Sequence, residues 1–397
     1  MRTKTTTVRV VAALAAFGLV AAACGGDDDD AAEPADEPAS EPADEPADEP
    51  ADEPADEPAA EGACAVDETD GDLAIYNWAE YIDEEQLAEF ADEYGIDVTM
   101  DTYDSNEAMQ PIVAAGNSGY SLIVPSDYMV TILIAGEDVM KLQKDAIPNL
   151  ANISADFQGL VYDPNGDYSV PYQWGTTGLG VDTAVVGTDF PRTWGLVFDP
   201  ALADEFSGSI SLLNDPRETM GAALRYLGYS LNTTSDAELD EATQLVADAT
   251  SRLAAFNTDS ADELLTTGET VIGHGYSGDM FTQFLETDDP AQYVYFVPEE
   301  GGTRWIDNMA VVFDAPAPCS AHTFINWLLG AEQGAALSNW NYYNTPNDAA
   351  LPLLDEELLA FADDPAVIPG GVESLESLVD TGDFEIKYSD AFNEAKG

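Results

Sequence analysis

The chain has 397 residues, and its 77 Asp and Glu side chains are opposed by only 12 Lys and Arg, so the formal net charge is −65 at pH 7. Phosphate binding requires clustered basic side chains, so this charge balance excludes nucleic acid as a partner. An anionic field instead favours cationic ligands.

The first 23 residues predict a signal peptide. Arg2, Lys4 and Arg9 precede an apolar stretch over residues 10–23 that is too short to span a bilayer. Cys24 follows three alanines, as in a bacterial lipobox, in which the cysteine becomes the lipidated first residue. Residue 21 is Ala where Leu is usual, and an ordinary signal peptide is the alternative. The sequence therefore predicts an extracytoplasmic, lipid-anchored protein.

Residues 24–70 are predicted to form a disordered stalk. "ADEP" repeats run through Pro58, and residues 25–61 contain 17 acidic and no basic side chains. Such a stretch has no apolar surface to bury and carries repelling charges, so it stays extended. The rest of the chain keeps 60 acidic and 9 basic residues, most of them expected on a solvated surface.

Two further cysteines, Cys64 and Cys319, lie in the part expected to fold. An exported chain with two such cysteines favours a disulfide that joins the end of the stalk to the domain. Two unpaired thiols are the alternative.

Residues 71–397 are too many for one ordinary core and predict two lobes. Strand and helix signals alternate in the following order: strand Leu73–Asn77, a helix capped by Asp83 that stops at Gly95, strand 96–101, a helix near 107–115, strand 121–124, strand 210–213, helix 216–227, a long helix near 237–255, strand 270–273, strand 304–313, and helices from His322 onward. This alternation predicts an α/β fold, in which ligands bind at the carboxyl ends of strands.

Aromatic rings and carboxylates gather at those strand ends. The candidates are Trp78, Glu80, Tyr81, Ser126, Tyr128, Asp215, Glu218, Tyr276, Asp279, Trp305, Asp307 and Tyr343. Each also has a structural explanation, because Asp215 and Asp279 can cap helices and either Trp can belong to the core. Their shared position at strand ends is the stronger signal.

Alkylammonium ions suit such a set of side chains. A cation over an aromatic face gains about 0.5–2 kcal/mol, and a hydrogen bond to a charged partner contributes roughly 1.5–3 kcal/mol. Spaced carboxylates between rings therefore match a linear polyamine with two or three charges. Adjacent Tyr342 and Tyr343 leave a ferric-ion or other cation-binding protein as an alternative. Carboxylates with aromatic platforms also occur in glycosidases, but no acid pair stands out here. No cofactor or metal motif is present.

The chain resembles the spermidine/putrescine-binding proteins of bacterial polyamine ABC importers. The resemblance is carried by "YNWAEY" (76–81), "TYDSNEAM" (102–109), "LIVPSDY" (122–128), "DYSVPYQWGTTGLGVD" (167–182), "RETMGAALRYLGYSLNTT" (217–234), "AAFNTDS" (254–260), "EEGGTRWIDNMAV" (299–311) and "NYYNTPN" (341–347). These motifs keep the family's order over residues 72–397.

The resemblance implies a two-lobed periplasmic-binding-protein fold that closes on ligand about a hinge. Lobe one would comprise residues 71–177 and 306–351, and lobe two residues 178–305 and 352–397. The implied protein is a monomeric binding protein without catalysis, which passes its ligand to membrane permease subunits. Asp215 and Glu218 would bind a terminal amine, and Trp305 with Asp307 the inner part of the ligand. Tyr276 stands where the family usually has Trp, and Asp279 is similar to the putrescine-preferring members.

Overall fold

The computed structural model describes residues 63–362, 366–371 and 374–397, all of which belong to one compact unit formed by residues 59–397. The predicted signal peptide, Cys24 and the stalk up to residue 62 lie outside the described residues. Within the described ranges, no helix has the length and apolar character needed to cross a membrane.

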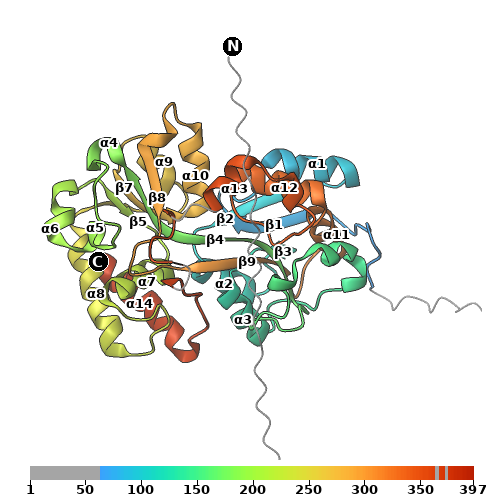
Figure 1. Cartoon of the computed structure of the whole chain (residues 1–397). Helices are drawn as coiled ribbons and strands as arrows, with labels where there is room; N and C mark the ends of the chain where they lie inside the picture. Colours follow the sequence, from blue (N-terminus) through green and yellow to red (C-terminus); the bar gives the residue numbers. More distant parts are fainter. Residues whose placement is uncertain (1–62, 363–365, 372–373) are drawn as a thin grey trace, which may run out of the picture. The chain divides into compact units, whose positions relative to one another are not determined.

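A nine-stranded sheet organises the unit (Figure 1). Its strands are β1 (Leu73–Trp78), β2 (Val98–Tyr103), β3 (Leu122–Ile123), β4 (Ser169–Asp182), β5 (Ile210–Leu212), β6 (Leu253–Phe256), β7 (Ile272–Tyr276), β8 (Tyr293–Phe296) and β9 (Arg304–Val311). The order is β2-β1-β3-β9-β4-β7-β5-β6, and β8 pairs with β4. β1 is parallel to β2 and β3, and β5 is parallel to β6 and β7, whereas β9 and β4 run antiparallel to their neighbours.

Helices pack on this sheet. The longer ones are α1 (Glu84–Tyr94), α2 (Asn106–Ala114), α3 (Asp127–Gly136), α7 (Pro216–Leu227), α8 (Asp236–Thr250), α10 (Ser277–Glu286), α11 (Pro318–Leu328), α12 (Ala331–Asn341) and α14 (Glu385–Lys396). The shorter ones are α4 (Thr183–Val186), α5 (Gly195–Phe198), α6 (Pro200–Ala203), α9 (Ala261–Thr266) and α13 (Glu356–Ala362).

Local sequence explains several helix boundaries. Asp83 caps α1 by accepting from the backbone N–H of Glu85, and Gly95 ends the helix at a φ of 67°. The buried side chains of α1 include Leu87 and Phe90. Asp215 caps α7, with Pro216 at its first position.

Two hydrophobic cores make the unit two-lobed. The first core contains buried side chains of β1, β3, α11 and the end of β9, and the second contains buried side chains of β5, α7, α8 and α14. β4 contributes Val170 and Tyr172 to the first core and Leu179 and Val181 to the second. β4 therefore crosses from one lobe to the other, and β9 lies beside it (Figure 1).

Cys64 and Cys319 form a disulfide bond that links residues 255 positions apart. Asp70 also accepts hydrogen bonds from the backbone N–H groups of Cys319 and Ser320 at the start of α11. The segment that follows residue 62 is thus held against the first lobe by a covalent bond and by hydrogen bonds.

Three expectations differ from the structure. The long helix near 237–255 ends at Thr250, and residues 253–256 form strand β6 instead. The helix expected from His322 begins four residues earlier, at Pro318. β4 was not predicted as a strand, because its three glycines interrupt the alternation that marks a half-buried strand.

Candidate functional site

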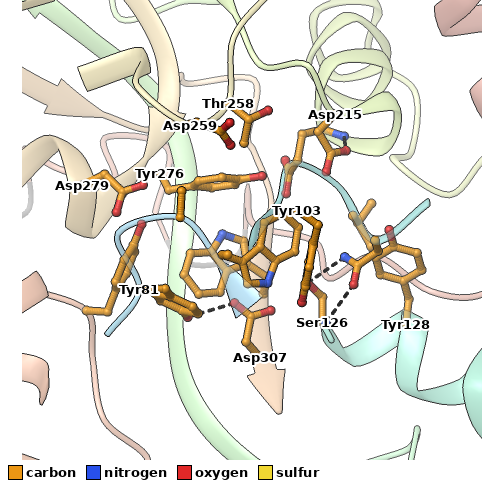
Figure 2. A pocket seen from close by; sticks show the side chains of 17 residues that line it. Tyr81, Tyr103, Ser126, Tyr128, Asp215, Thr258, Asp259, Tyr276, Asp279 and Asp307 are labelled. Carbon is orange, nitrogen blue, oxygen red and sulfur yellow. Dashed lines mark hydrogen bonds between the residues drawn. The ribbon is translucent and has the colours of Figure 1, made fainter. Parts of the chain in front are cut away.

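The predicted strand ends converge on one pocket between the lobes (Figure 2). β1 and β3 end there, and antiparallel β9 begins there, while β7 and the loop after β5 reach it from the second lobe. The pocket encloses about 620 Å³ of empty space, part of which is open to solvent. Its lining residues are Trp78, Ala79, Tyr81, Tyr103, Asn106, Ser126, Tyr128, Asp215, Glu218, Thr258, Asp259, Tyr276, Asp279, Trp305, Asp307, Tyr343 and Leu378.

Aromatic rings packed edge to face form much of the wall. The ring centroid of Trp305 lies 5.8 Å from that of Tyr276 and 5.2 Å from that of Tyr343, and Trp78 lies 6.2 Å from Tyr276. Each indole is fixed by its N–H, since Trp78 donates to the carbonyl of Val124 and Trp305 donates to a threonine hydroxyl of β4. Both indoles of the wall thus have their N–H groups paired within the protein.

Gly175 in β4 allows Trp305 to take this position. A Cβ atom at Gly175 would lie 2.7 Å from the Trp305 indole, closer than atoms approach in real structures. The glycine that weakened the strand signal in the sequence is thus required by the packing of the site.

Asp307 lies in the middle of the pocket and is 5% exposed. Its Oδ2 accepts a hydrogen bond from the Tyr81 hydroxyl at 2.8 Å. The backbones of Ser126 and Asp307 form an isolated antiparallel β-bridge. Its Oδ1 has no hydrogen-bond partner among the described residues. Burial raises the pKa of Asp307 to about 7. A buried carboxylate with a free oxygen is costly unless a cation reaches it.

Asp215 and Glu218 supply two carboxylates from the start of α7. Asp215 accepts the backbone N–H of Glu218 at 2.9 Å, and Glu218 accepts the hydroxyl of Thr303 at 2.7 Å. Burial raises the pKa of both groups, that of Glu218 to about 7, and Glu107 with Glu218 raises the pKa of Asp215 further. Asp215 is thus both a helix cap and a pocket residue, so its two interpretations do not compete.

Asp279 provides a carboxylate at another side of the pocket. In the view of Figure 2 it lies opposite Asp215, with Asp307 below and between them. Tyr343 hydrogen-bonds to Asp279, and burial raises the pKa of Asp279, with a further contribution from Asp262. Asp279 lies in the first turn of α10 and does not occupy the capping position, which is Tyr276. Separated carboxylates therefore face one aromatic-walled slot.

Eleven of the twelve predicted site residues line the pocket, and Glu80 does not. Glu80 lies in the turn after β1 with a φ of 51° and is exposed. Partial burial raises the pKa of Glu80, and the charges of Glu263, Glu286 and Asp259 raise it further. The charge of Glu80 in turn raises the pKa of the pocket residue Asp279, although Glu80 itself does not line the pocket.

The sequence reasoning missed several lining residues. Thr258 and Asp259 follow β6, which was hidden inside the expected long helix, so its strand end was not recognised. Tyr103 ends β2 and Asn106 begins α2, and the quoted motif "TYDSNEAM" contains both. In the described ranges, no group of three or more His, Cys, Asp or Glu is arranged to hold a metal ion.

Comparisons with known proteins agree with this geometry. The family model of bacterial extracellular solute-binding proteins matches residues 85–369. A putrescine/cadaverine-binding protein of Pseudomonas aeruginosa is 34% identical over 296 residues, which cover 73% of this chain and 83% of the relative. The spermidine/putrescine-binding periplasmic protein of Escherichia coli is 35% identical over 298 residues, with coverage of 75% and 83%.

Solved structures show the same similarity. The spermidine/putrescine ABC transporter substrate-binding protein PotD of Streptococcus pneumoniae matches with a TM-score of 0.63 and 32% identity, covering 82% of this chain and 99% of that one. The TpPotD lipoprotein of Treponema pallidum matches with a TM-score of 0.69 and 28% identity, with the same coverage.

Two lobes joined by a crossing strand, with a ligand-sized pocket between them, are the arrangement of a ligand-binding protein that closes about a hinge. This chain belongs to the bacterial extracellular solute-binding protein family.

Proposed function

We propose that the protein is the extracytoplasmic substrate-binding component of an ABC importer and that its slot captures a linear polyamine, spermidine or putrescine. Relatives at 33–35% identity carry these ligands in their names. The slot offers what such a ligand needs, because rings flank its methylenes and carboxylates meet its ammonium groups.

Asp307 carries the proposal. It is a buried carboxylate at the centre of an aromatic enclosure, and one of its oxygens lacks a partner among the described residues. The same pocket holds Asp215, Glu218, Asp259 and Asp279 but no basic side chain in its lining. A cationic ligand balances this charge, whereas a neutral or anionic ligand leaves it unpaired.

The proposal assigns the twelve predicted residues to ligand binding, and Glu80 is the one among them that does not line the pocket. Trp78, Tyr81, Tyr128, Tyr276, Trp305 and Tyr343 would line the slot, Ser126 would support Asp307, and Asp215, Glu218 and Asp279 would pair with amines. We further propose lobe boundaries of 71–177 with 306–351 and 178–305 with 352–397. All members of the second core fall within the proposed lobe two, and the members of the first core fall within lobe one except Leu231, Trp305 and Leu378.

Anchoring and partners complete the proposal. Cys24 would be acylated after removal of residues 1–23, and the acidic repeat would hold the unit away from the membrane. The TpPotD relative is described as a lipoprotein, which supports this arrangement. The liganded protein, as a monomer, would deliver polyamine to permease subunits, with ATP hydrolysed by other chains.

Isothermal titration of the unit formed by residues 59–397 tests the proposal. Spermidine, putrescine, free amino acids, Ca²⁺ and Fe³⁺ would be titrated at moderate and high salt, because charges within a Debye length of about 10 Å at 0.1 M attract polyamines without a site. We expect one-to-one polyamine binding that persists at high salt. Weak heats from several sites that vanish at high salt would refute polyamine capture, and tight Fe³⁺ binding with a tyrosinate absorption band would favour the ferric-ion alternative.

A further inference from the structure

The start of α7 contacts the first lobe beside the pocket. Asn214 precedes Asp215, the cap of α7, and Met220 of this helix belongs to the second core. Asp104 follows Tyr103, which belongs to the first core. The Asn214 Nδ2 donates to Asp104 Oδ2 at 2.5 Å, across 110 residues of chain. This hydrogen bond therefore joins side chains that belong to different lobes.

The second lobe holds the Asn214 amide in one orientation. The backbone N–H of Asn214 donates to the Thr258 hydroxyl at 3.0 Å, and the Lys396 ammonium donates to Asn214 Oδ1. Lys396 itself lies over the rings of Phe256 and Phe392, 5.3 Å and 4.9 Å from their centroids. Because Lys396 occupies the amide oxygen, the amide nitrogen faces Asp104.

A second contact lies on the other side of Asp215. The Arg217 guanidinium is buried and lies 5.1 Å from the ring centroid of Tyr128, a pocket residue of the first lobe. The Tyr128 hydroxyl donates to Glu107 at 2.7 Å, and Arg217 pairs with Glu385 of α14. Asn214 and Arg217 thus bracket Asp215 in sequence, and each contacts the first lobe.

We propose that Asp104 and Asn214 are positioning residues for ligand binding, whose hydrogen bond latches the start of α7, and with it Asp215, against the first lobe when the cleft closes. Neither residue lines the pocket, so each acts through Asp215. The inference rests on the proposed polyamine function for the identity of the ligand.

The charges around the latch explain why it closes on an occupied cleft. Closure brings Asp104 and Glu107 of the first lobe towards Asp215 and Asp259 of the second. Burial is the largest cause that raises the pKa of Asp215, and the charge of Glu107 raises it further. Burial likewise raises the pKa of Asp259, and the charge of Asp104 adds to the effect. Arg217 is already paired with Glu385. An ammonium group at Asp215 offsets the repulsion between these carboxylates, so the latch forms most readily with ligand present.

Stopped-flow fluorescence of the full chain with spermidine and putrescine tests the latch. A hydrogen bond to a charged group is worth about a tenfold change or more in an equilibrium constant. We expect Asp104→Ala to raise the dissociation rate about tenfold or more, with an association rate within about threefold of wild type, since latching follows encounter. Asp104→Asn keeps an acceptor oxygen and should dissociate within about threefold of wild type.

Asp92→Ala is the matched control. Asp92 is exposed on α1, and its replacement removes the same charge from the same lobe. The double variant Asp104→Ala/Asn214→Ala should dissociate no faster than the faster single variant, since both remove one bond. Melting of the ligand-free variants should match wild type. Equal dissociation rates for Asp104→Ala and Asp92→Ala, or for Asp104→Ala and Asp104→Asn, would overturn the latch. Absence of polyamine binding by the wild type would instead refute the proposed function.

Discussion

Asp307 offers the sharpest test of the site. Replacing it with Asn keeps the size and shape of the side chain and can keep the hydrogen bond from Tyr81, which is 2.8 Å long. The change removes a negative charge from the pocket lining and replaces one acceptor oxygen by an NH2 donor, which a ligand ammonium group cannot use. Any loss of affinity therefore reports the pairing between this carboxylate and a cation, and not a collapse of the wall.

The size of the effect follows from burial. Asp307 is 5% exposed, so solvent screens its charge little, and Oδ1 is available for a ligand N–H. Truncating one partner of a buried charge pair costs about 2–5 kcal/mol. At 1.4 kcal/mol per tenfold change, this loss weakens polyamine affinity by roughly 30-fold to several thousand-fold.

Titration calorimetry of wild type and Asp307→Asn with spermidine measures the loss. Asp127→Asn is the matched control, because Asp127 is also buried, at 3% exposed, but does not line the pocket. We expect the control to bind within about fivefold of wild type, since burial raises the pKa of Asp127 to about 8 and the side chain does not line the pocket. Near-normal binding by Asp307→Asn, or an equal loss in both variants, would refute the assignment of Asp307 as a ligand contact.

Three further predictions follow from the described contacts. Burial raises the pKa of Asp307 from 3.8 and that of Glu218 from 4.5 to about 7. The contribution of these two groups to the free energy of unfolding is therefore fully present at low pH and is lost as pH rises through 7. The melting temperature of the ligand-free protein should therefore fall between about pH 4 and 7 through these two groups, and Asp307→Asn should reduce that fall in thermal scans; an unchanged slope would contradict a buried Asp307. Replacing Cys64 and Cys319 by Ser should lower the free energy of unfolding by about 2–5 kcal/mol in denaturant titrations, because the bond closes a long loop, while polyamine affinity stays unchanged; a fall in affinity would show that the bond supports the pocket. Glu80→Gln should change the affinity less than about threefold in calorimetry, because Glu80 is exposed and outside the pocket lining; a loss as large as that of Asp307→Asn would place Glu80 in contact with ligand.

Much of the site was predictable because local signals mark strand ends. Trp78, Asp215, Tyr276 and Trp305 each lie within three residues of a strand terminus, and such termini meet at one edge of a sheet. Antiparallel β9 meets the same edge with its amino end, and this is how Asp307 joins side chains from parallel strands.

The missed residues have a physical cause. Helix α8 and strand β6 follow each other with two residues between them, and the alanines of "RLAAF" suit either structure, so residues 253–255 were predicted as helix. The end of β6, and with it Thr258 and Asp259, therefore went unrecognised. Glu80 stays a prediction as a ligand contact, and it lies outside the pocket lining, in a turn where its φ is 51°.

The sequence by itself determined the charge, the helix caps, the alternation of strands and helices, and the residue types at strand ends. These features depend on neighbours a few positions apart, for which local chemistry suffices. Only the tertiary structure decided which carboxylates share the pocket, that Asp307 keeps a free oxygen, that β4 crosses both lobes, and that Asn214 reaches Asp104. These features depend on contacts between segments more than 100 residues apart. The packing of the two cores, and not the local sequence, sets the geometry of such contacts.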